Sequence, residues 1–160
     1  MRMCSIASGS SGNCIYVGSG SHHLLIDAGI SGKRVEAGLK ELQLSGKDID
    51  GILLTHEHSD HIKGLGVLSR KYDIPIYATP GTAEAVKAMS SLGKIDGELF
   101  REIHADQDFQ IGDLLISPFH ISHDAAEPVA YRVACGEKEM AVATDLGVYT
   151  RYTNEHLEGQ

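Results

Sequence analysis

Short apolar runs alternate with segments rich in Gly and Ser at the start of the chain. The runs predict strands at residues 2–7, 14–17 and 23–26. Residues 8–13 and 18–21 separate these strands, and such Gly/Ser-rich segments are typical of tight turns. We therefore expect the chain to open with three strands joined by turns.

A helical period begins at Ser31, after which helices and strands alternate. Val35, Leu39 and Leu42 recur roughly on one face and predict a helix. Residues 52–54 are apolar throughout, as in a strand buried on both faces. The remaining pattern predicts a helix at 62–72, a strand at 74–78, a helix at 82–92, and strands at 114–117, 129–134 and 139–143. The order contains no repeat or linker and predicts one mixed α/β domain over residues 1–160.

Composition excludes several classes of protein. A length of 160 residues suits one domain, and 42% hydrophobic with 22% charged residues is ordinary globular composition rather than that of a disordered chain. No apolar run approaches the roughly 20 residues that cross a bilayer, so no membrane partner is expected. The N-terminus lacks the apolar stretch of a signal peptide.

The cysteine spacing and the net charge exclude further classes of protein. The three cysteines are widely spaced and form no C-x-x-C pair, which argues against a disulfide scaffold and predicts a reducing, cytoplasmic location. The net charge of −8 disfavours indiscriminate nucleic-acid binding, which needs a broad basic surface. A focused nuclease cleft remains compatible with that charge.

The strongest chemical signal is a histidine cluster directly after the predicted strand at 52–54. His56 and His58 are two residues apart, so their side chains can point the same way in an extended turn. Asp60 and His61 fall in the first turn of the next predicted helix and can face a second position. Imidazole and carboxylate suit Zn²⁺, Mn²⁺ or Fe²⁺. One loop can thus supply ligands to two metals.

Two metals need further ligands, and two later segments offer them. Residues 118–125 follow a predicted strand and contain His120 and His123, of which His123 is the stronger candidate. Asp145 comes directly after the predicted strand at 139–143. An Asp that closes a strand is often only a turn or N-cap residue, so spacing leaves its role as a metal ligand open.

Taken together, these segments resemble the metallo-β-lactamase superfamily. The matching motifs are Asp27 after an apolar strand, T-H-E-H-S-D-H at 55–61, F-H-I-S-H-D-A at 119–125 and T-D-L-G at 144–147. The S-G-S-S-G-N loop at 8–13 and H-S-D-H-I-K-G at 58–64 resemble its WalJ/YycJ-like branch, regarded as bacterial cytoplasmic phosphodiesterases or DNA exonucleases. The resemblance implies an αββα sandwich with its metals at the edge where the two sheets meet.

The resemblance also implies a role for each site residue. His56, His58 and His123 would hold one divalent metal, Asp60 and His61 the other, and Asp145 would bridge the two. Asp27 would orient the ligand loop through hydrogen bonds. Zinc is the first expectation, with manganese or iron as alternatives. A hydroxide held between the metals would attack a phosphodiester such as DNA, with Asp60 as ligand and proton acceptor.

One departure from the family pattern is evident. The family's fifth motif, a downstream histidine, has no match before Gln160, and His156 lies in an expected helix just after Thr150. The sequence therefore predicts a domain that is incomplete at its C-terminus, with an exposed face that favours a homo-oligomer. Two alternatives stay open: a hydrolase of small esters, thioesters or lactones on the same frame, or a metal-binding fragment without activity.

Overall fold

Two β-sheets lie face to face, and the helices among the described residues lie on one side of them. The computed structural model describes residues 1–9, 12–121, 125–143 and 147–152. The first sheet has the strand order β1 (Arg2–Ala7), β2 (Cys14–Gly18), β3 (His23–Ile26), β4 (Gly51–Leu53), β5 (Ile76–Ala78) and β6 (Phe100–Glu102). Strands β1 to β3 are antiparallel, whereas β3 to β6 run parallel to one another.

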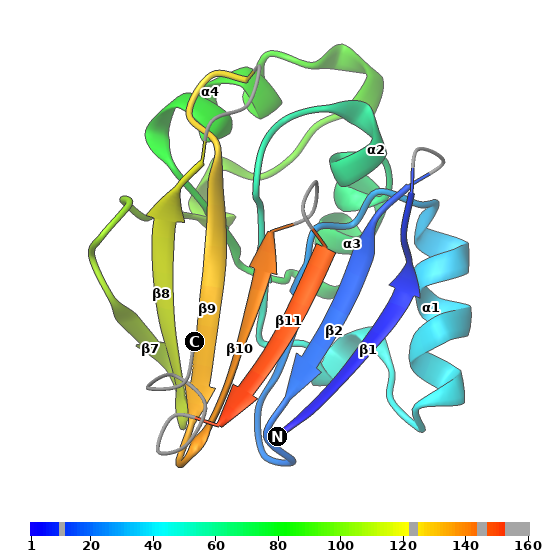
Figure 1. The fold of residues 1–160 in the computed structure, drawn as a ribbon. Helices are drawn as coiled ribbons and strands as arrows, with labels where there is room; N and C mark the ends of the chain where they lie inside the picture. Colours follow the sequence, from blue (N-terminus) through cyan, green and yellow to red (C-terminus); the bar gives the residue numbers. More distant parts are fainter. Residues whose placement is uncertain (10–11, 122–124, 144–146, 153–160) are drawn as a thin grey trace.

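The second sheet is an antiparallel meander. It contains β7 (Phe109–Ile111), β8 (Leu114–His120), β9 (Val129–Cys135), β10 (Lys138–Ala143) and β11 (Gly147–Tyr152) in consecutive order. In Figure 1 this sheet occupies the foreground, and no described helix lies in front of it.

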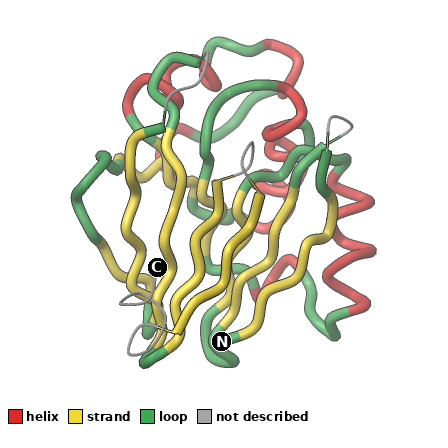
Figure 2. Tube along the Cα trace, viewed as in Figure 1, coloured by secondary structure: helices red, strands yellow, loops and turns green. Residues whose placement is uncertain are grey.

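The helices cover the far face of the first sheet. They are α1 (Gly32–Glu41), α2 (Ser59–Ile62), α3 (Leu65–Tyr72) and α4 (Pro80–Lys87), with 3₁₀ turns η1 (Gly46–Asp48), η2 (Ser90–Leu92) and η3 (Gly97–Leu99). Figure 2 shows the helices in red at the top and right of the view, beside the yellow strands. No described helix has the length and apolar character needed to cross a membrane.

Burial on both faces explains the continuous apolar runs of β2, β3 and β4. Alternate residues of β3 enter different cores: Leu25 packs toward the helices, whereas Leu24 and Ile26 pack against the second sheet. Residues such as Tyr131 and Val133 of β9 fill the space between the sheets. The first sheet is therefore a buried middle layer, as the hydrophobic pattern predicts.

The structure confirms the predicted fold class and corrects three elements. The helix predicted at 82–92 ends as α4 at Lys87, and the separate 3₁₀ turn η2 covers Ser90–Leu92. The helix predicted at 62–72 is divided at Gly64, whose N–H donates to the Ala28 carbonyl at 2.7 Å. A Cβ at Gly64 would lie 2.3 Å from the Ile30 carbonyl oxygen, so the chain bends there to pack on that loop. The helix expected just after Thr150 is also wrong for the described residues, because β11 pairs with β10 as far as Tyr152.

Candidate metal centre

The histidine cluster lies at the carboxyl ends of β3 and β4. Because these strands are parallel, Asp27 after β3 and Thr55 after β4 reach the same edge of the sheet. The Asp27 N–H donates to the Leu53 carbonyl at 2.8 Å, which fixes the two chain segments side by side. Asp60 and His61 follow in α2, as the sequence predicts. Edges where parallel strands end commonly carry ligand sites.

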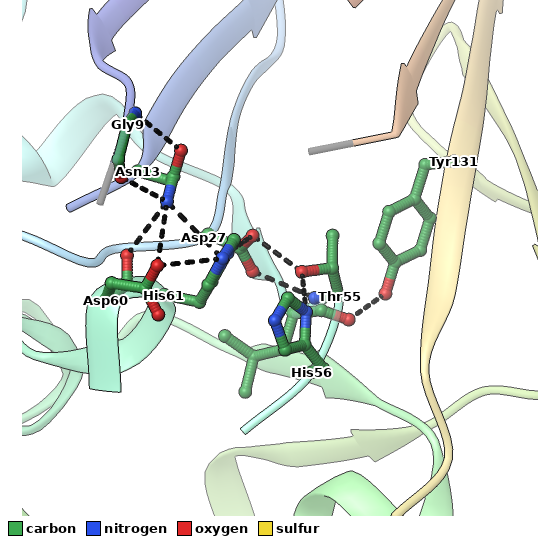
Figure 3. A network of polar contacts seen from close by, with 9 residues as sticks. Gly9, Asn13, Asp27, Thr55, His56, Asp60, His61 and Tyr131 are labelled. Carbon is green, nitrogen blue, oxygen red and sulfur yellow. Dashed lines mark hydrogen bonds and ion pairs between the residues drawn. The ribbon is translucent and has the colours of Figure 1, made fainter. Parts of the chain in front are cut away.

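Asp27 is the buried centre of the polar network in Figure 3. Its Oδ1 accepts the Thr55 N–H at 2.8 Å, and its Oδ2 accepts both Thr55 Oγ1 at 2.7 Å and His61 Nδ1 at 2.7 Å. The side chain is 0% exposed, so these bonds offset the cost of burying a carboxylate. Its backbone φ of +64° is left-handed, a conformation that Asp tolerates better than most residues.

Counting hydrogens in this network assigns the tautomers of two histidines. The Thr55 hydroxyl has a single hydrogen, which it donates to Asp27. Its oxygen, 2.8 Å from His56 Nδ1, must therefore accept the His56 Nδ1–H. His61 likewise donates Nδ1–H to Asp27. Both rings thus carry their lone pair on Nε2, as metal-binding histidines do when the other nitrogen donates to a carboxylate or hydroxyl.

The remaining predicted donors of this loop lie beside those two rings. The His56 ring centroid is 4.0 Å from that of His61 and 4.7 Å from that of His58. Asp60 Oδ2 is 3.5 Å from His61 Nε2, and the Asp60 side chain is 35% exposed. The structure therefore brings together His56, His58, Asp60 and His61, with His56 and His61 buried and the other two partly open to solvent.

Close packing against neighbouring loops holds the Asp60–His61 turn. The Asn13 N–H donates to the Asp60 carbonyl at 2.7 Å, and Asn13 Nδ2 lies 3.3 Å from His61 Nε2. The Ala28 N–H donates to the His61 carbonyl at 2.8 Å. A Cβ at Gly29 would lie only 1.8 Å from the Asp60 carbonyl oxygen, so only glycine fits there.

On the other side, the start of β9 and the residues before it contact the histidine loop. The Val129 N–H donates to the Thr55 carbonyl at 3.0 Å, and the Ala126 N–H donates to Glu57 Oε2 at 2.9 Å. Tyr131 Oη donates to the Leu54 carbonyl. These bonds join the two sheets at the site. They also anchor one end of the β8–β9 connection, which contains His123.

Glu127 anchors the same connection to α4. Its Oε1 accepts the Gly81 N–H at 2.8 Å, and its carbonyl accepts Thr79 Oγ1 at 2.8 Å. The hydroxyl of Thr82 donates to the same carbonyl at 3.3 Å. The described residues that follow His123 are therefore fixed both to the histidine loop and to the start of α4.

Burial and the negative charge of Asp27 act on two neutral groups near the site. Burial, and secondarily the charge of Asp27, raise the pKa of the Cys14 thiol. The same two causes, in the same order, raise the pKa of the Tyr131 phenol well above its ordinary value. Both groups therefore stay protonated at neutral pH, and Tyr131 remains a donor to the Leu54 carbonyl.

The donors suit a divalent metal in type, although the described ones do not complete a shell. Lone pairs on two imidazole Nε2 atoms beside a carboxylate are the ligands that Zn²⁺, Mn²⁺ and Fe²⁺ accept. Within residues 1–9, 12–121, 125–143 and 147–152, no three His, Cys, Asp or Glu side chains are placed to hold one ion. His123 and Asp145 lie outside the described residues, so their roles stay predictions. β10 does run toward this edge, since Val142 pairs with Tyr131.

Sequence reasoning missed most of the residues that position the donors. Thr55 is adjacent to the cluster, and Asn13 lies in the S-G-S-S-G-N loop, so a polar residue beside a motif was the available signal. Glu57 lies within the motif itself, although its main-chain partner, Ala126, is far away in the sequence. Glu127 and Tyr131 gave no such signal, because they lie outside the motifs and their partners are main-chain groups far away in the sequence. His120, the weaker histidine candidate, ends β8 with an exposed side chain.

Comparison with known proteins identifies relatives of this chain and solved structures that share its fold. The exodeoxyribonuclease YycJ of Bacillus anthracis is 44% identical over 96% of this chain, and the exodeoxyribonuclease WalJ of Streptococcus pneumoniae is 40% identical over the same share. The chain spans 56% of the length of each. A solved B3 metallo-β-lactamase with an active-site glutamic acid superposes with a TM-score of 0.72 at 17% identity, over 88% of this chain and 57% of that one. The model of the beta-lactamase superfamily domain matches residues 22–160, and the chain therefore belongs to the beta-lactamase superfamily.

Proposed function

We propose that residues 1–160 belong to a metal-dependent hydrolase that cleaves phosphodiester bonds in DNA. The observation that carries the proposal is the 44% identity to a protein named an exodeoxyribonuclease, over a span that includes the whole histidine cluster. The chain spans about half the length of that relative, so the activity proposed is that of the whole protein. The cysteine usage supports a cytoplasmic location as part of the same proposal.

The proposed cofactor is a pair of divalent ions, zinc in the first place and manganese or iron otherwise. His56, His58 and His123 would hold one ion, Asp60 and His61 the other, and Asp145 would lie between them. When bound, such ions act as Lewis acids toward phosphate oxygens and lower the pKa of water toward neutrality.

The protein's own residues prepare this chemistry. Asp27 and Thr55 keep a hydrogen on Nδ1 of His61 and His56, so that Nε2 of each is available as a ligand. The Asp60 carboxylate is partly open to solvent, where it can accept a proton from an attacking water. The backbone bonds from Asn13 and Ala28 hold Asp60 and His61 in place, which limits reorganisation during the reaction.

The test compares substrates on the purified chain. Labelled DNA, bis-p-nitrophenyl phosphate and p-nitrophenyl acetate are incubated with Zn²⁺ or Mn²⁺, with EDTA and with His58→Ala as controls. DNA cleavage that needs metal and His58 supports the proposal. Cleavage of the acetate alone supports the small-ester alternative, and metal binding without any turnover supports the inactive fragment. Cleavage of the acetate alone contradicts the proposal, and metal binding without turnover shows that residues 1–160 do not carry the activity by themselves.

A further inference from the structure

An open cleft lies next to the candidate metal centre, on the side of α2. Its volume is about 440 Å³, within the roughly 300–1,000 Å³ range of small-molecule sites. Asp60, Lys63 and Ser91 contribute polar groups to its lining, and Ile62, Met89 and Leu92 contribute apolar surface. Asp60 is shared with the metal centre, so a ligand in the cleft would reach the proposed reaction site.

The far wall of the cleft is fixed to the body of the protein. Arg70 of α3 donates from Nη1 to the carbonyls of Leu92 at 2.8 Å and Lys94 at 2.9 Å. A Cβ at Gly66 would lie 2.1 Å from the Leu92 carbonyl oxygen, so helix and turn touch directly. The near wall is held by the contact between Gly29 and Asp60. Both walls are therefore in place before a ligand arrives.

Lys63 is the one positively charged side chain among the described residues that line the cleft. Lys71 is engaged with Glu36 at 2.8 Å, and the Arg70 guanidinium with the two carbonyls. Lys63 lines the cleft, is exposed, and forms no hydrogen bond or ion pair with any residue that the structure describes. In a chain with a net charge of −8, this ammonium is the group that would attract an anion to the cleft.

We infer that this cleft is the subsite for one nucleotide of the substrate strand, with Lys63 contacting a phosphate next to the scissile bond and the Met89–Leu92 wall contacting the sugar and base. The inference rests on the proposed function. Lysine acts on phosphate as a point charge, and apolar contacts do not distinguish bases by hydrogen bonding. Binding at this subsite is therefore sensitive to salt and tolerant of sequence.

Binding without turnover tests the subsite. The affinity of a short fluorescein-labelled DNA strand is measured by anisotropy in EDTA over a series of NaCl concentrations. Lys63→Gln is compared with Lys40→Gln, an exposed lysine on α1 that does not line the cleft, and Ser91→Trp fills the cleft from an exposed position. We expect Lys63→Gln to reduce the slope of log K against log[NaCl] by about 0.7, the value for one lost contact to single-stranded phosphate. We expect Ser91→Trp to weaken binding with an unchanged thermal midpoint, and Lys40→Gln to behave as the unmodified chain.

Equal slopes for Lys63→Gln and Lys40→Gln would overturn the inference, as would an unmodified chain that binds no DNA. Cleavage of DNA by the metal-loaded chain is scored separately. Cleavage together with equal slopes contradicts the subsite alone. Binding that depends on Lys63 without cleavage supports the cleft as a nucleotide subsite and shows that residues 1–160 alone do not carry the proposed nuclease activity.

Discussion

Asp27 determines how the histidines present their nitrogens, because one buried carboxylate accepts three hydrogen bonds from Thr55 and His61. Replacing it by Asn keeps the size but turns one acceptor into a donor, which must face another donor. Asp27→Asn should therefore lower zinc affinity by roughly 10–100-fold, as measured by competition with a chelating dye. Asp73→Asn is the matched control, since Asp73 also has a left-handed backbone but lies exposed at the end of α3. Equal losses in the two variants would refute the role of Asp27.

The buried thiol of Cys14 makes stability depend on alkaline pH. Burial and Asp27 raise its pKa in the folded state, so the folded chain retains a proton that the unfolded chain releases. The resulting stabilisation is complete below the ordinary thiol pKa of about 8.5 and is lost as pH rises further, by up to about 1.4 kcal/mol per pH unit. Urea unfolding between about pH 8 and pH 10 should show this decline, and Cys14→Ala should remove it. A decline that persists unchanged in Cys14→Ala would contradict the assignment.

At the residue scale, the sequence predicts donors better than the groups that position them. His56, His58, Asp60 and His61 follow from one local motif after an apolar strand. The Asp27–Thr55–His56 relay requires β3 and β4 to be parallel neighbours in a given register, and no local pattern encodes that. The resemblance implied that Asp27 supports the loop, and its bonds to Thr55 and His61 are consistent with that role.

At the scale of elements, the contact between the β3–α1 loop and α2 sets the shape of the site. Gly29→Ala would place a methyl group 1.8 Å from the Asp60 carbonyl and push α2 away. We expect the free energy of unfolding to fall by about 1–3 kcal/mol, the usual cost of overpacking, in a urea titration. Gly97→Ala has open space around its Cβ and serves as the control, with little change expected. An unchanged free energy of unfolding in Gly29→Ala would show that the β3–α1 loop can move to accommodate the methyl group.

One carboxylate of the histidine motif, that of Glu57, helps to hold the connection between β8 and β9. Glu57→Ala removes the acceptor of the Ala126 N–H. Hydrogen exchange at the Ala126 amide should become at least about tenfold faster, the equivalent of roughly 1.4 kcal/mol of lost protection. Glu84→Ala, an exposed carboxylate on α4, should leave that rate unchanged. Unaltered exchange in Glu57→Ala would mean that Val129 and Glu127 hold the segment alone.

The predicted elements agree with the observed ones where the local hydrophobic pattern sets their bounds. They differ where tertiary contacts end or divide an element. The strands at 2–7 and 23–26 agree with the observed bounds of β1 and β3. The helix at 62–72 is broken because Gly64 packs on the Ala28–Ile30 backbone, a contact that the apolar period of Ile62, Leu65 and Leu68 does not reveal. The short strands β6 and β7 have no counterpart among the predicted strands, since three residues carry too little periodicity.

At the scale of the whole molecule, none of the described helices or strands covers the outer face of the second sheet. Leu115 on this face is 36% exposed, and the Arg132 guanidinium lies over the Phe119 ring at 4.7 Å. An uncovered sheet face with apolar side chains favours self-association. Light scattering should therefore report a dimer or larger species, and Leu115→Glu should shift it toward monomer. A monomer at all concentrations would contradict this expectation.

The central claim concerns metal binding by the clustered donors, and metal content per purified chain tests it most directly. The chain is loaded with Zn²⁺, passed through a desalting column and analysed by mass spectrometry for bound metal, beside His58→Ala. We predict about two ions per chain when both proposed positions fill, and a lower content in His58→Ala. A content of one ion per chain would mean that only one of the two proposed positions binds metal. No bound metal, or equal content in both proteins, would contradict the account.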